Sequence, residues 1–545
     1  MCSEINSLLS KEGMKMGKVN LLDCTLRDGG YINDWRFTFE GAKTIVNKLS
    51  KTGIEMIEVG FLKGKEYDPE KTLFPDTKSF TNVIGEKNPN VSYVGMLDMS
   101  APVAKECIYK RDADSIDGIR VIFKKDKTEE GFEYCEYISQ MGYDLYVNFV
   151  GTDQYSDEEF IKGIEKFNVL NPAGMTIVDT FGVIKRKSFL HYCEIADKYM
   201  NKSTALCYHA HNNMQQAFGN AEALLDMELD RDVVIDACVF GMGRGAGNLN
   251  LELFAEHMND NFGTNYRIEP MLEIMDEYLT EFYKARQWGY NLPFYLSASL
   301  GCHPNYAIYL ADKDSLSEKA FRELLKSIGP EDKLVFSKEK AEKYYRLYMD
   351  NYIDDKEAIR NLSGELAGKE VLLIAPGASI RNNRNDIDAL IEKSRIGDSL
   401  SVISVNFTAD DFKPDYVFSA NMRRYGKMIG KFSGKSIVTS NMKQEGDFVV
   451  NFSSYALDDE EIIDNSGLML IGILRDAGVK HVYIAGMDGY NKRQSDGSRS
   501  LDYADRKLDY DFTAGADKRN ELIKKNLDRL SKEIEIEFIT PSMYA

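Results

Sequence analysis

The chain lacks the cysteine spacings that build disulfide frameworks or zinc clusters. Its eight cysteines are scattered over 545 residues without a CxxC pair. Cys24, Cys207 and Cys238 stand inside apolar runs that are typical of buried strands. This usage favours buried thiols in a reducing compartment, so we expect the protein in the cytoplasm.

The sequence also lacks a long hydrophobic run and a surplus of positive charge. No stretch of about 18 apolar residues occurs, which argues against a membrane-spanning helix. Residues 1–16 are polar, without the apolar core of a signal peptide, and we expect them to form a tail. The net charge of -19 argues against a general nucleic-acid or anionic-membrane surface. Apolar and charged contents of 43% and 28% are those of a soluble globular protein with several domains.

Histidine is scarce, with six in the whole chain, yet two of them stand two positions apart. His209 and His211 follow the apolar run Thr204–Tyr208, which has the pattern of a buried strand. Residues two apart on a strand point to the same face, so both imidazoles can approach one divalent metal ion. The alternative is two satisfied polar residues at the end of a strand.

Short apolar runs alternate with amphipathic helical patterns from Val19 to about Phe262. Thr38–Ser50 has one apolar helical face, and Ser156 opens a later helix as a capping box. Eight such units are the number expected for a (β/α)8 TIM barrel, which we predict for residues 17–263. A doubly wound open sheet is the alternative. The predicted strands are Val19–Cys24, Glu55–Gly60, Ser92–Leu97, Gly118–Phe123, Asp144–Val150, Met175–Asp179, Thr204–Tyr208 and Val233–Phe240.

In TIM barrels the chemistry lies at the C-terminal ends of the strands. Asp28, which follows the first predicted strand, supplies a carboxylate to accompany the two histidines. Two histidines and one carboxylate with open positions suit Mn²⁺, Fe²⁺, Co²⁺ or Zn²⁺, and the open positions admit substrate oxygens. The other polar residues at these ends are Asp23, Arg27, Glu58, Arg120, Asn148, Asp179, Thr180 and those of Gly241–Asn248.

Two further regions follow the predicted barrel. Residues 264–362 have helical patterns rich in aromatic residues and are predicted as a helical extension. Residues 368–545 alternate seven short strands with helices, which predicts a Rossmann-like α/β domain with an open sheet. Its Pro376–Ser379 turn can receive a phosphate at a helix N-terminus, although it lacks a Walker lysine. An ordinary strand-to-helix turn is the alternative.

Three sequence blocks follow the first, seventh and eighth predicted strands: Leu22–Gly30 (LDCTLRDGG), His209–Asn213 (HAHNN) and Gly241–Asn248 (GMGRGAGN). Together they resemble the metal-dependent DRE-TIM metallolyase superfamily, which is HMG-CoA lyase-like. With Ile57–Gly60 (IEVG) and the helical extension, the chain is most similar to 4-hydroxy-2-oxovalerate aldolase over about residues 17–310. Leu373–Ser379 and the later Tyr483–Tyr490 resemble a sialyltransferase-like or pterin diphosphokinase-like α/β domain.

The resemblance implies a role for six residues around a metal. Asp28, His209 and His211 would be metal ligands, joined by Asn248 in some branches. Mn²⁺ is the favoured ion, with Mg²⁺, Co²⁺ or Zn²⁺ as alternatives. Arg27 would polarise the 2-oxo group and stabilise the enolate, and Glu58 would order Arg27 or the metal's water. The structural alternatives are a salt-bridge partner for Arg27 and a satisfied buried residue for Glu58.

The catalytic base departs from the pattern of the aldolases. Tyr31 stands where they have a histidine, and an unperturbed tyrosine titrates near 10, which makes it a poor base at neutral pH. Tyr31 can instead donate a hydrogen bond to a substrate hydroxyl. Tyr295, His303 and Tyr306 on the extension are other candidates, and Tyr295 is the match for an extension tyrosine of the family.

These observations predict a divalent-metal-dependent aldolase that cleaves or forms a 4-hydroxy-2-oxo acid from a small 2-oxo acid and an aldehyde. A place in surface-glycan or sugar metabolism is a further hypothesis. One alternative is a Claisen-type acyltransferase that condenses acetyl-CoA with a 2-oxo acid. Another is a metal-stabilised barrel whose C-terminal domain binds a nucleotide or nucleotide sugar. Dinucleotide binding at Gly241-x-Gly243 is disfavoured because this block closes the eighth unit of a barrel. We expect a homo-oligomer.

Overall fold

The computed structural model describes residues 17–64, 66–395, 399–428, 430–432, 434–490 and 516–545. The predicted N-terminal tail lies outside these residues. The chain divides into two compact units, residues 1–308, called the barrel unit below, and residues 309–545, called the C-terminal unit. The division falls inside the region predicted as a helical extension.

Eight parallel strands close into a barrel, which confirms the predicted TIM barrel and excludes an open sheet. Closure is made by β1, which pairs with β9 on one side and with β2 on the other. A short ninth strand, β3 (Leu73–Phe74), pairs only with the end of β2. The barrel strands are β1 (Val19–Asp23), β2 (Met56–Leu62), β4 (Ser92–Asp98), β5 (Gly118–Phe123), β6 (Asp144–Phe149), β7 (Gly174–Asp179), β8 (Ala205–Ala210) and β9 (Val233–Ala237).

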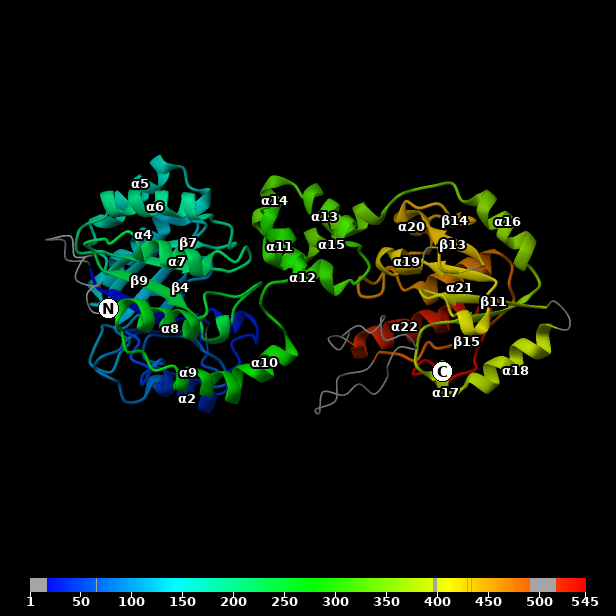
Figure 1. The fold of residues 1–545 in the computed structure, drawn as a ribbon, viewed down its shortest axis with the longest axis horizontal. Coiled ribbons are helices and arrows are strands. Elements are labelled where there is room, and N and C mark those ends of the chain that lie inside the picture. The colour runs from blue at the N-terminus through cyan, green and yellow to red at the C-terminus, as the bar shows by residue number, and fades with distance from the viewer. Residues whose placement is uncertain (1–16, 65, 396–398, 429, 433, 491–515) are drawn as a thin grey trace, which may run out of the picture. The chain divides into compact units, whose positions relative to one another are not determined.

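Helices surround the barrel strands (Figure 1). Helix α2 begins where the Thr38 hydroxyl accepts the Gly41 N–H, and α5 begins with the predicted capping box between Ser156 and Glu159. The helices that begin in the barrel unit are α2 (Phe39–Leu49), α3 (Thr81–Ile84), α4 (Thr128–Gln140), α5 (Asp157–Asn168), α6 (Arg186–Tyr199), α7 (Ala217–Leu225), α8 (Leu251–Phe262), α9 (Glu269–Ile274), α10 (Thr280–Ala285), α11 (Leu292–Ser299) and α12 (Pro304–Asp312), of which α11 and α12 do not belong to the ring around the strands. Short 3-10 or π segments are η1 (Gly29–Tyr31), η2 (Lys105–Cys107), η3 (Lys125–Lys127), η4 (Thr152–Gln154), η5 (Val239–Gly241) and η6 (Met275–Leu279).

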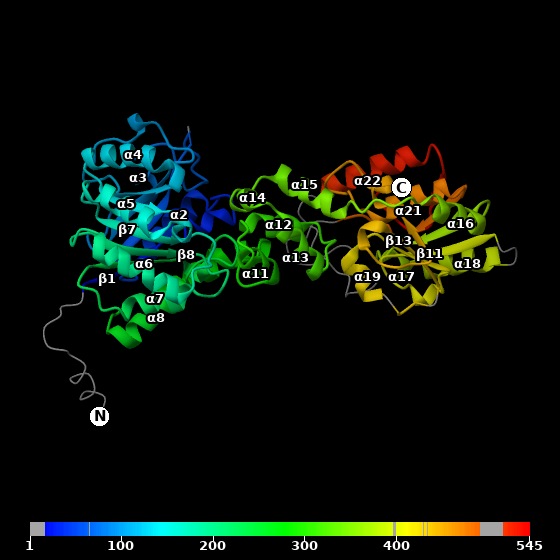
Figure 2. The ribbon, with the colours of Figure 1, turned by 90° about the horizontal axis from the view of Figure 1, so that it is seen from above.

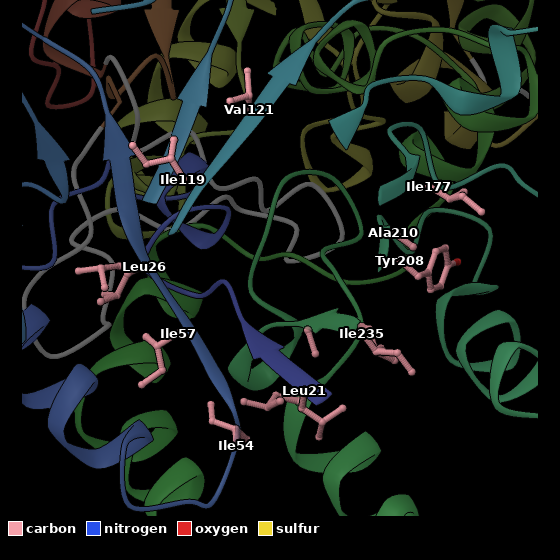
Figure 3. Close-up of a cluster of buried hydrophobic side chains, with 14 of the residues drawn as sticks. Leu21, Leu26, Ile54, Ile57, Ile119, Val121, Ile177, Tyr208, Ala210 and Ile235 are labelled. Carbon is pink, nitrogen blue, oxygen red and sulfur yellow. The ribbon is translucent and has the colours of Figure 1, made fainter. Parts of the chain in front are cut away.

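Side chains alternate between the two faces of the barrel strands, so those packed against the helices are separated from those in the barrel interior. Ile57, Ile119, Tyr208 and Ile235 belong to the large cluster packed between strands and helices (Figure 3). The residues that alternate with these along each strand point into the barrel interior. A second, smaller apolar cluster fills the barrel interior with Leu22, Cys24, Met56, Val94, Tyr146, Ala205, Cys207, Val234 and Cys238. Polar side chains from neighbouring inward positions are therefore presented together toward the C-terminal end.

The C-terminal unit holds a sheet of seven parallel strands in the order β14-β13-β12-β11-β10-β15-β16, as predicted for an open α/β sheet. Figure 2 shows α21 and α22 over one face and α17 and α19 over the other. The strands are β10 (Glu370–Ile374), β11 (Leu400–Val405), β12 (Tyr416–Ser419), β13 (Lys435–Thr439), β14 (Phe448–Val450), β15 (His481–Ala485) and β16 (Glu535–Phe538).

The chain order reverses between β10 and β15, so this pair forms the topological switch point of the sheet. None of the helices in the described chain is both long and apolar enough to cross a membrane. The helical segments of this unit are α13 (Glu318–Ser327), α14 (Pro330–Leu334), α15 (Lys338–Met349), α16 (Lys356–Leu366), α17 (Ser379–Asn382), α18 (Arg384–Arg395), η7 (Asp410–Phe412), α19 (Met422–Met428), η8 (Ser440–Met442), α20 (Phe452–Tyr455), α21 (Ser466–Asp476) and α22 (Ala516–Leu530).

Candidate metal centre

Asp28, His209 and His211 meet at the C-terminal end of the barrel. His209 lies in β8, two residues after Cys207, and His211 follows the end of the strand. Because residues two apart along a strand point to the same face, both rings lie on one face. Asp28 arrives from the loop after β1. His209 Nε2 lies 3.9 Å from Asp28 Oδ1, and His211 Nδ1 lies 3.8 Å from Asp28 Oδ2. One ligand atom from each residue falls within 4.8 Å of the others, so this group can hold a metal ion.

The donor atoms fit a divalent ion in spacing and in chemistry. Bonds of about 2.1 Å place two ligands at most about 4.2 Å apart, and the two measured separations are shorter than that. All three residues are buried. His211 Nδ1 makes no hydrogen bond to the described chain, and a buried nitrogen without a partner is expected where an ion completes the site. Burial first, and then the cation Arg244, lowers the pKa of His211 to about 3 despite Asp28, so the ring is neutral and its lone pair is available.

Asn248 borders the same group. Its amide nitrogen donates to Asp28 Oδ2 at 2.7 Å and to the Met242 carbonyl at 3.0 Å. Its Oδ1 is buried and makes no hydrogen bond to the described chain. The asparagine therefore orients Asp28 in this structure and keeps an oxygen that an ion can use.

Arg27 connects the metal-binding group to Glu58. Its Nη1 donates to Asp28 Oδ1 at 2.5 Å and its Nε to Glu58 Oε2 at 2.6 Å. Burial alone would raise the pKa of Asp28, but Arg27 and the two histidines hold it below its usual range, so Asp28 is ionised. Arg27 Nη2 is buried without a hydrogen bond within the described chain. This N–H is the one that remains to meet an oxygen of a bound molecule.

Two residues without an assigned role in the sequence analysis complete the network. Arg120 on β5 donates to Glu58 Oε1 at 3.1 Å and to Asp236 Oδ2 at 2.5 Å. Asp236 on β9 in turn lies 3.1 Å from His209 Nδ1. The charged chain Asp28–Arg27–Glu58–Arg120–Asp236 thus runs back to His209.

Asp236 could have been found from the sequence. It is a charged residue inside the apolar run Val233–Phe240, and charged residues in buried strands are rare unless they are paired. Its carboxylate lies 3.1 Å from His209 Nδ1, while His209 Nε2 faces Asp28, so the two ring nitrogens face different carboxylates and a carboxylate behind a ligand histidine orients its ring.

A second possible metal group shares His209. Cys24, His209 and Asp236 also bring one donor atom each within 4.8 Å. However, Asp236 already accepts a hydrogen bond from Arg120. Burial and the neighbouring Cys238 thiol, 3.4 Å away, raise the pKa of the Cys24 thiol well above its usual value. The group with Asp28 is therefore the better cation site.

Tyr31 and Tyr295, both predicted as catalytic, lie in different surroundings. Tyr31 lies near the metal-binding group, with Trp35 and Arg244 against its ring. Burial raises the pKa of Tyr31 above 10, even though Arg244 opposes this shift, so the phenol is a hydrogen-bond donor and a poor base. Tyr295 on α11 is 37% exposed, and no contact in the described chain joins its side chain to the metal-binding group.

The Pro376–Ser379 turn of the C-terminal unit is bound by a carboxylate of the same unit, that of Asp488. Asp488, after β15, accepts the Ser379 N–H at 2.9 Å and also the Ser379 hydroxyl. Thr540 closes the turn by accepting the Gly486 N–H at 2.9 Å and contacting the Ser379 hydroxyl. Because Asp488 takes the N–H that a phosphate would need, this turn provides no support for the predicted phosphate-binding role.

The match to a known protein family falls in the barrel unit. Residues 123–275 match the HMGL-like family. The 4-hydroxy-2-oxovalerate aldolase of Geobacillus genomosp. 3 is 23% identical over 268 residues, which are 48% of this chain and 77% of the relative. The oxaloacetate decarboxylase of Mycobacterium tuberculosis is 22% identical over 240 residues, covering 43% of this chain and 67% of that one.

Among solved structures, HMG-CoA lyase from Brucella melitensis is 17% identical, with a TM-score of 0.40, over 50% of this chain and 99% of that chain. These matches lend no support to a transferase-like identity of the C-terminal unit. The matched range 123–275 contains His209, His211 and Asn248, three of the residues around the candidate metal site. Residues 123–275 of the barrel are therefore similar to the HMGL-like family, and 4-hydroxy-2-oxovalerate aldolases are among the proteins that the chain resembles.

Proposed function

We propose that the barrel is a divalent-metal-dependent aldolase acting on 4-hydroxy-2-oxo acids. The single observation that carries this proposal is the buried group of Asp28, His209 and His211 beside the free Nη2 of Arg27. The names of the two relatives point the same way. Aldol cleavage of a 4-hydroxy-2-oxo acid and decarboxylation of oxaloacetate both break the C3–C4 bond and leave the enolate of pyruvate.

A divalent ion held by Asp28, His209 and His211, with Mn²⁺ favoured, would supply a Lewis acid for the carboxylate and 2-oxo oxygens of the substrate. The protein's own groups do the rest. Arg27 Nη2 donates to the 2-oxo oxygen and stabilises the negative charge that develops there as the C3–C4 bond breaks. Glu58 and Asp28 hold the guanidinium in place through the other two nitrogens. The electron pair of the bond passes to C3 and the 2-oxo oxygen, and the 4-hydroxyl carbon becomes an aldehyde.

Tyr31 serves in this scheme as a donor. Its raised pKa keeps the phenolic proton, so the proton of the 4-hydroxyl leaves to another base and Tyr31 hydrogen bonds to the oxygen of the forming aldehyde. The reaction in the other direction makes a carbon–carbon bond between pyruvate and an aldehyde.

The test combines metal analysis with a pyruvate-release assay over a panel of 4-hydroxy-2-oxo acids. We expect release that depends on a divalent ion and disappears in Asp28→Ala and His209→Ala. His191→Ala is the matched control, because this exposed histidine contacts Asp157 on the outside of the barrel. Full activity after removal of all divalent metal would overturn the proposal. Release of thiol from acetyl-CoA with a 2-oxo acid would favour the Claisen-type alternative, and pyruvate release from oxaloacetate alone would favour a decarboxylase.

A further inference from the structure

Arg244 is a cation at the barrel mouth, and none of the acidic residues that the structure describes pairs with it. It lies in the loop after β9, between Gly243 and Gly245, and its guanidinium carbon is 5.0 Å from the centre of the Tyr31 ring. Its Nε is buried and makes no hydrogen bond, and no ion pair to Arg244 occurs within the described part of the chain. Arg27 and Arg120 differ in this respect, because each holds two carboxylates.

Three other groups lie within the electrostatic reach of Arg244. Its charge lowers the pKa of His211, His303 and Tyr31, in each case as a smaller effect than burial. The geometry agrees with this, because the guanidinium of Arg244 lies against the Tyr31 ring and the preceding residue, Gly243, approaches Asp28 Oδ2 closely.

His303 adds a hydrogen-bond donor near Arg244. It stands in the turn between α11 and α12, with its ring centre 6.0 Å from that of Phe181, just after β7. Its Nδ1 accepts the Asn305 N–H at 3.2 Å, which places the proton of the neutral ring on Nε2. The guanidinium of Arg244 and the phenol of Tyr31 are both donors and lie next to each other. A planar, multiply donating cation with a further donor beside it matches a carboxylate or phosphate.

We propose that the aldehyde partner of the 2-oxo acid carries its own carboxylate or phosphate and that Arg244 binds this group. The inference rests on the proposed function and specifies its second substrate. The carboxylate of the 2-oxo acid is a less suitable occupant, because in the proposed function the ion held by Asp28, His209 and His211 would already bind it. In this scheme Tyr31 meets the carbonyl oxygen of the aldehyde, and Arg244, against the Tyr31 ring, meets its anionic group.

The experiment measures kcat/KM for condensation of pyruvate with matched pairs of aldehydes. Succinic semialdehyde is compared with butanal, and glyceraldehyde 3-phosphate with glyceraldehyde. We expect the anionic member of at least one pair to be preferred by roughly 10- to 100-fold, the range for a charge-assisted hydrogen bond, and Arg244→Met to abolish this preference. The pair that shows the preference distinguishes a carboxylate from a phosphate.

Arg267→Met is the matched control. Arg267 is exposed, and its backbone N–H bonds to the Thr52 carbonyl before β2, at the opposite end of the barrel. It removes the same charge, and the preference should persist.

A separate readout distinguishes the two proposals. Metal-dependent exchange of the pyruvate methyl protons for deuterium, followed by NMR, reports enolate formation without any aldehyde. Exchange together with equal use of both members of each pair would overturn the anionic-aldehyde inference and leave the proposed function standing. A preference that survives in Arg244→Met would also overturn it. Absence of both exchange and cleavage would overturn the proposed function and this inference with it.

Discussion

The barrel mouth and the C-terminal edge of the second sheet occupy equivalent places in their folds. Both collect polar side chains beyond the carboxyl ends of parallel strands, where α/β proteins bind ligands. At the second sheet several of these side chains satisfy one another, as in the bonds of Ser379 to Asp488 and of Ser419 to Asn406, although Ser404 Oγ in β11 is buried without a hydrogen bond within the described chain. At the barrel mouth, Arg27 Nη2, His211 Nδ1 and Asn248 Oδ1 are buried without a hydrogen-bond partner in the described chain, and they surround one group of possible metal ligands. Topology alone therefore does not identify a site, and a cluster of unpaired buried donors and acceptors does.

The two regions also differ in charge. The barrel mouth holds two arginines and three carboxylates in one buried network, and buried ions are retained only when each has a partner. The pairs just named at the second edge contain one carboxylate, Asp488, and otherwise hydroxyls and an amide. Changing one residue of the buried network, or one of the paired groups at the second edge, tests this difference.

The largest effect is expected for Arg120→Met. Glu58 and Asp236 would each lose a buried partner, and breaking a buried ion pair lowers the free energy of unfolding by about 3–5 kcal/mol. Both tryptophans of the chain, Trp35 and Trp288, lie in the barrel unit, so urea unfolding followed by tryptophan fluorescence reports this unit.

Arg186→Met is the matched control, because Arg186 pairs with Asp226 at 3.3 Å with both side chains more than half exposed. The free energy of unfolding should change there by less than about 1 kcal/mol. Equal losses in the two variants would show that the buried network contributes no more than a surface pair.

The next effect concerns metal affinity. Asp236→Asn leaves the three proposed ligands in place and removes the carboxylate beside His209 Nδ1. Loss of such a partner typically weakens metal binding by about 10- to 100-fold. Competition with a chelator measures the affinity for Mn²⁺, and circular dichroism checks that the variant is folded. Unchanged affinity would mean that Asp236 serves Arg120 alone.

A smaller effect is expected at the second edge. Asp488→Ala removes the acceptor of the Ser379 N–H and hydroxyl, and a buried donor left without a partner lowers stability by about 1–3 kcal/mol. Thermal unfolding followed by circular dichroism should shift downward. The fluorescence transition of the barrel unit and its Mn²⁺ affinity should not change. Tighter binding of a nucleotide by this variant would instead indicate that Asp488 occupies a ligand's position.

Most of the fold was predictable because hydrophobic periodicity is local. All eight barrel strands and all seven strands of the second sheet were predicted within a few residues, since each is a short apolar run between turns. Closure followed from the count of units. The short edge strand β3 could not be predicted, because two residues carry no pattern.

The site was predictable where residues are close in sequence or carried by a motif. His209 and His211 share a strand, and the motif containing Arg27 and Asp28 resembles a known one. Arg120 and Asp236 come from strands 116 positions apart, so only the closed barrel shows that they are neighbours. Likewise, the absence of an acidic partner for Arg244 is a property of packing, which a sequence does not display.

The smallest effect is expected for Tyr31→Phe. The raised pKa of Tyr31 keeps it protonated at neutral pH, so the change removes one hydrogen bond of a neutral donor, which corresponds to about a 2- to 10-fold loss of kcat/KM. The pH dependence of kcat/KM between about pH 6 and 9 should keep its shape, because a group whose pKa lies above the usual value near 10 does not titrate there. Suppose instead that the variant loses most of its activity and that an inflection in the pH profile of kcat/KM disappears in this range: Tyr31 would then be the base. In that case, counting unpaired buried donors and acceptors would not be enough to identify the catalytic groups of the barrel mouth.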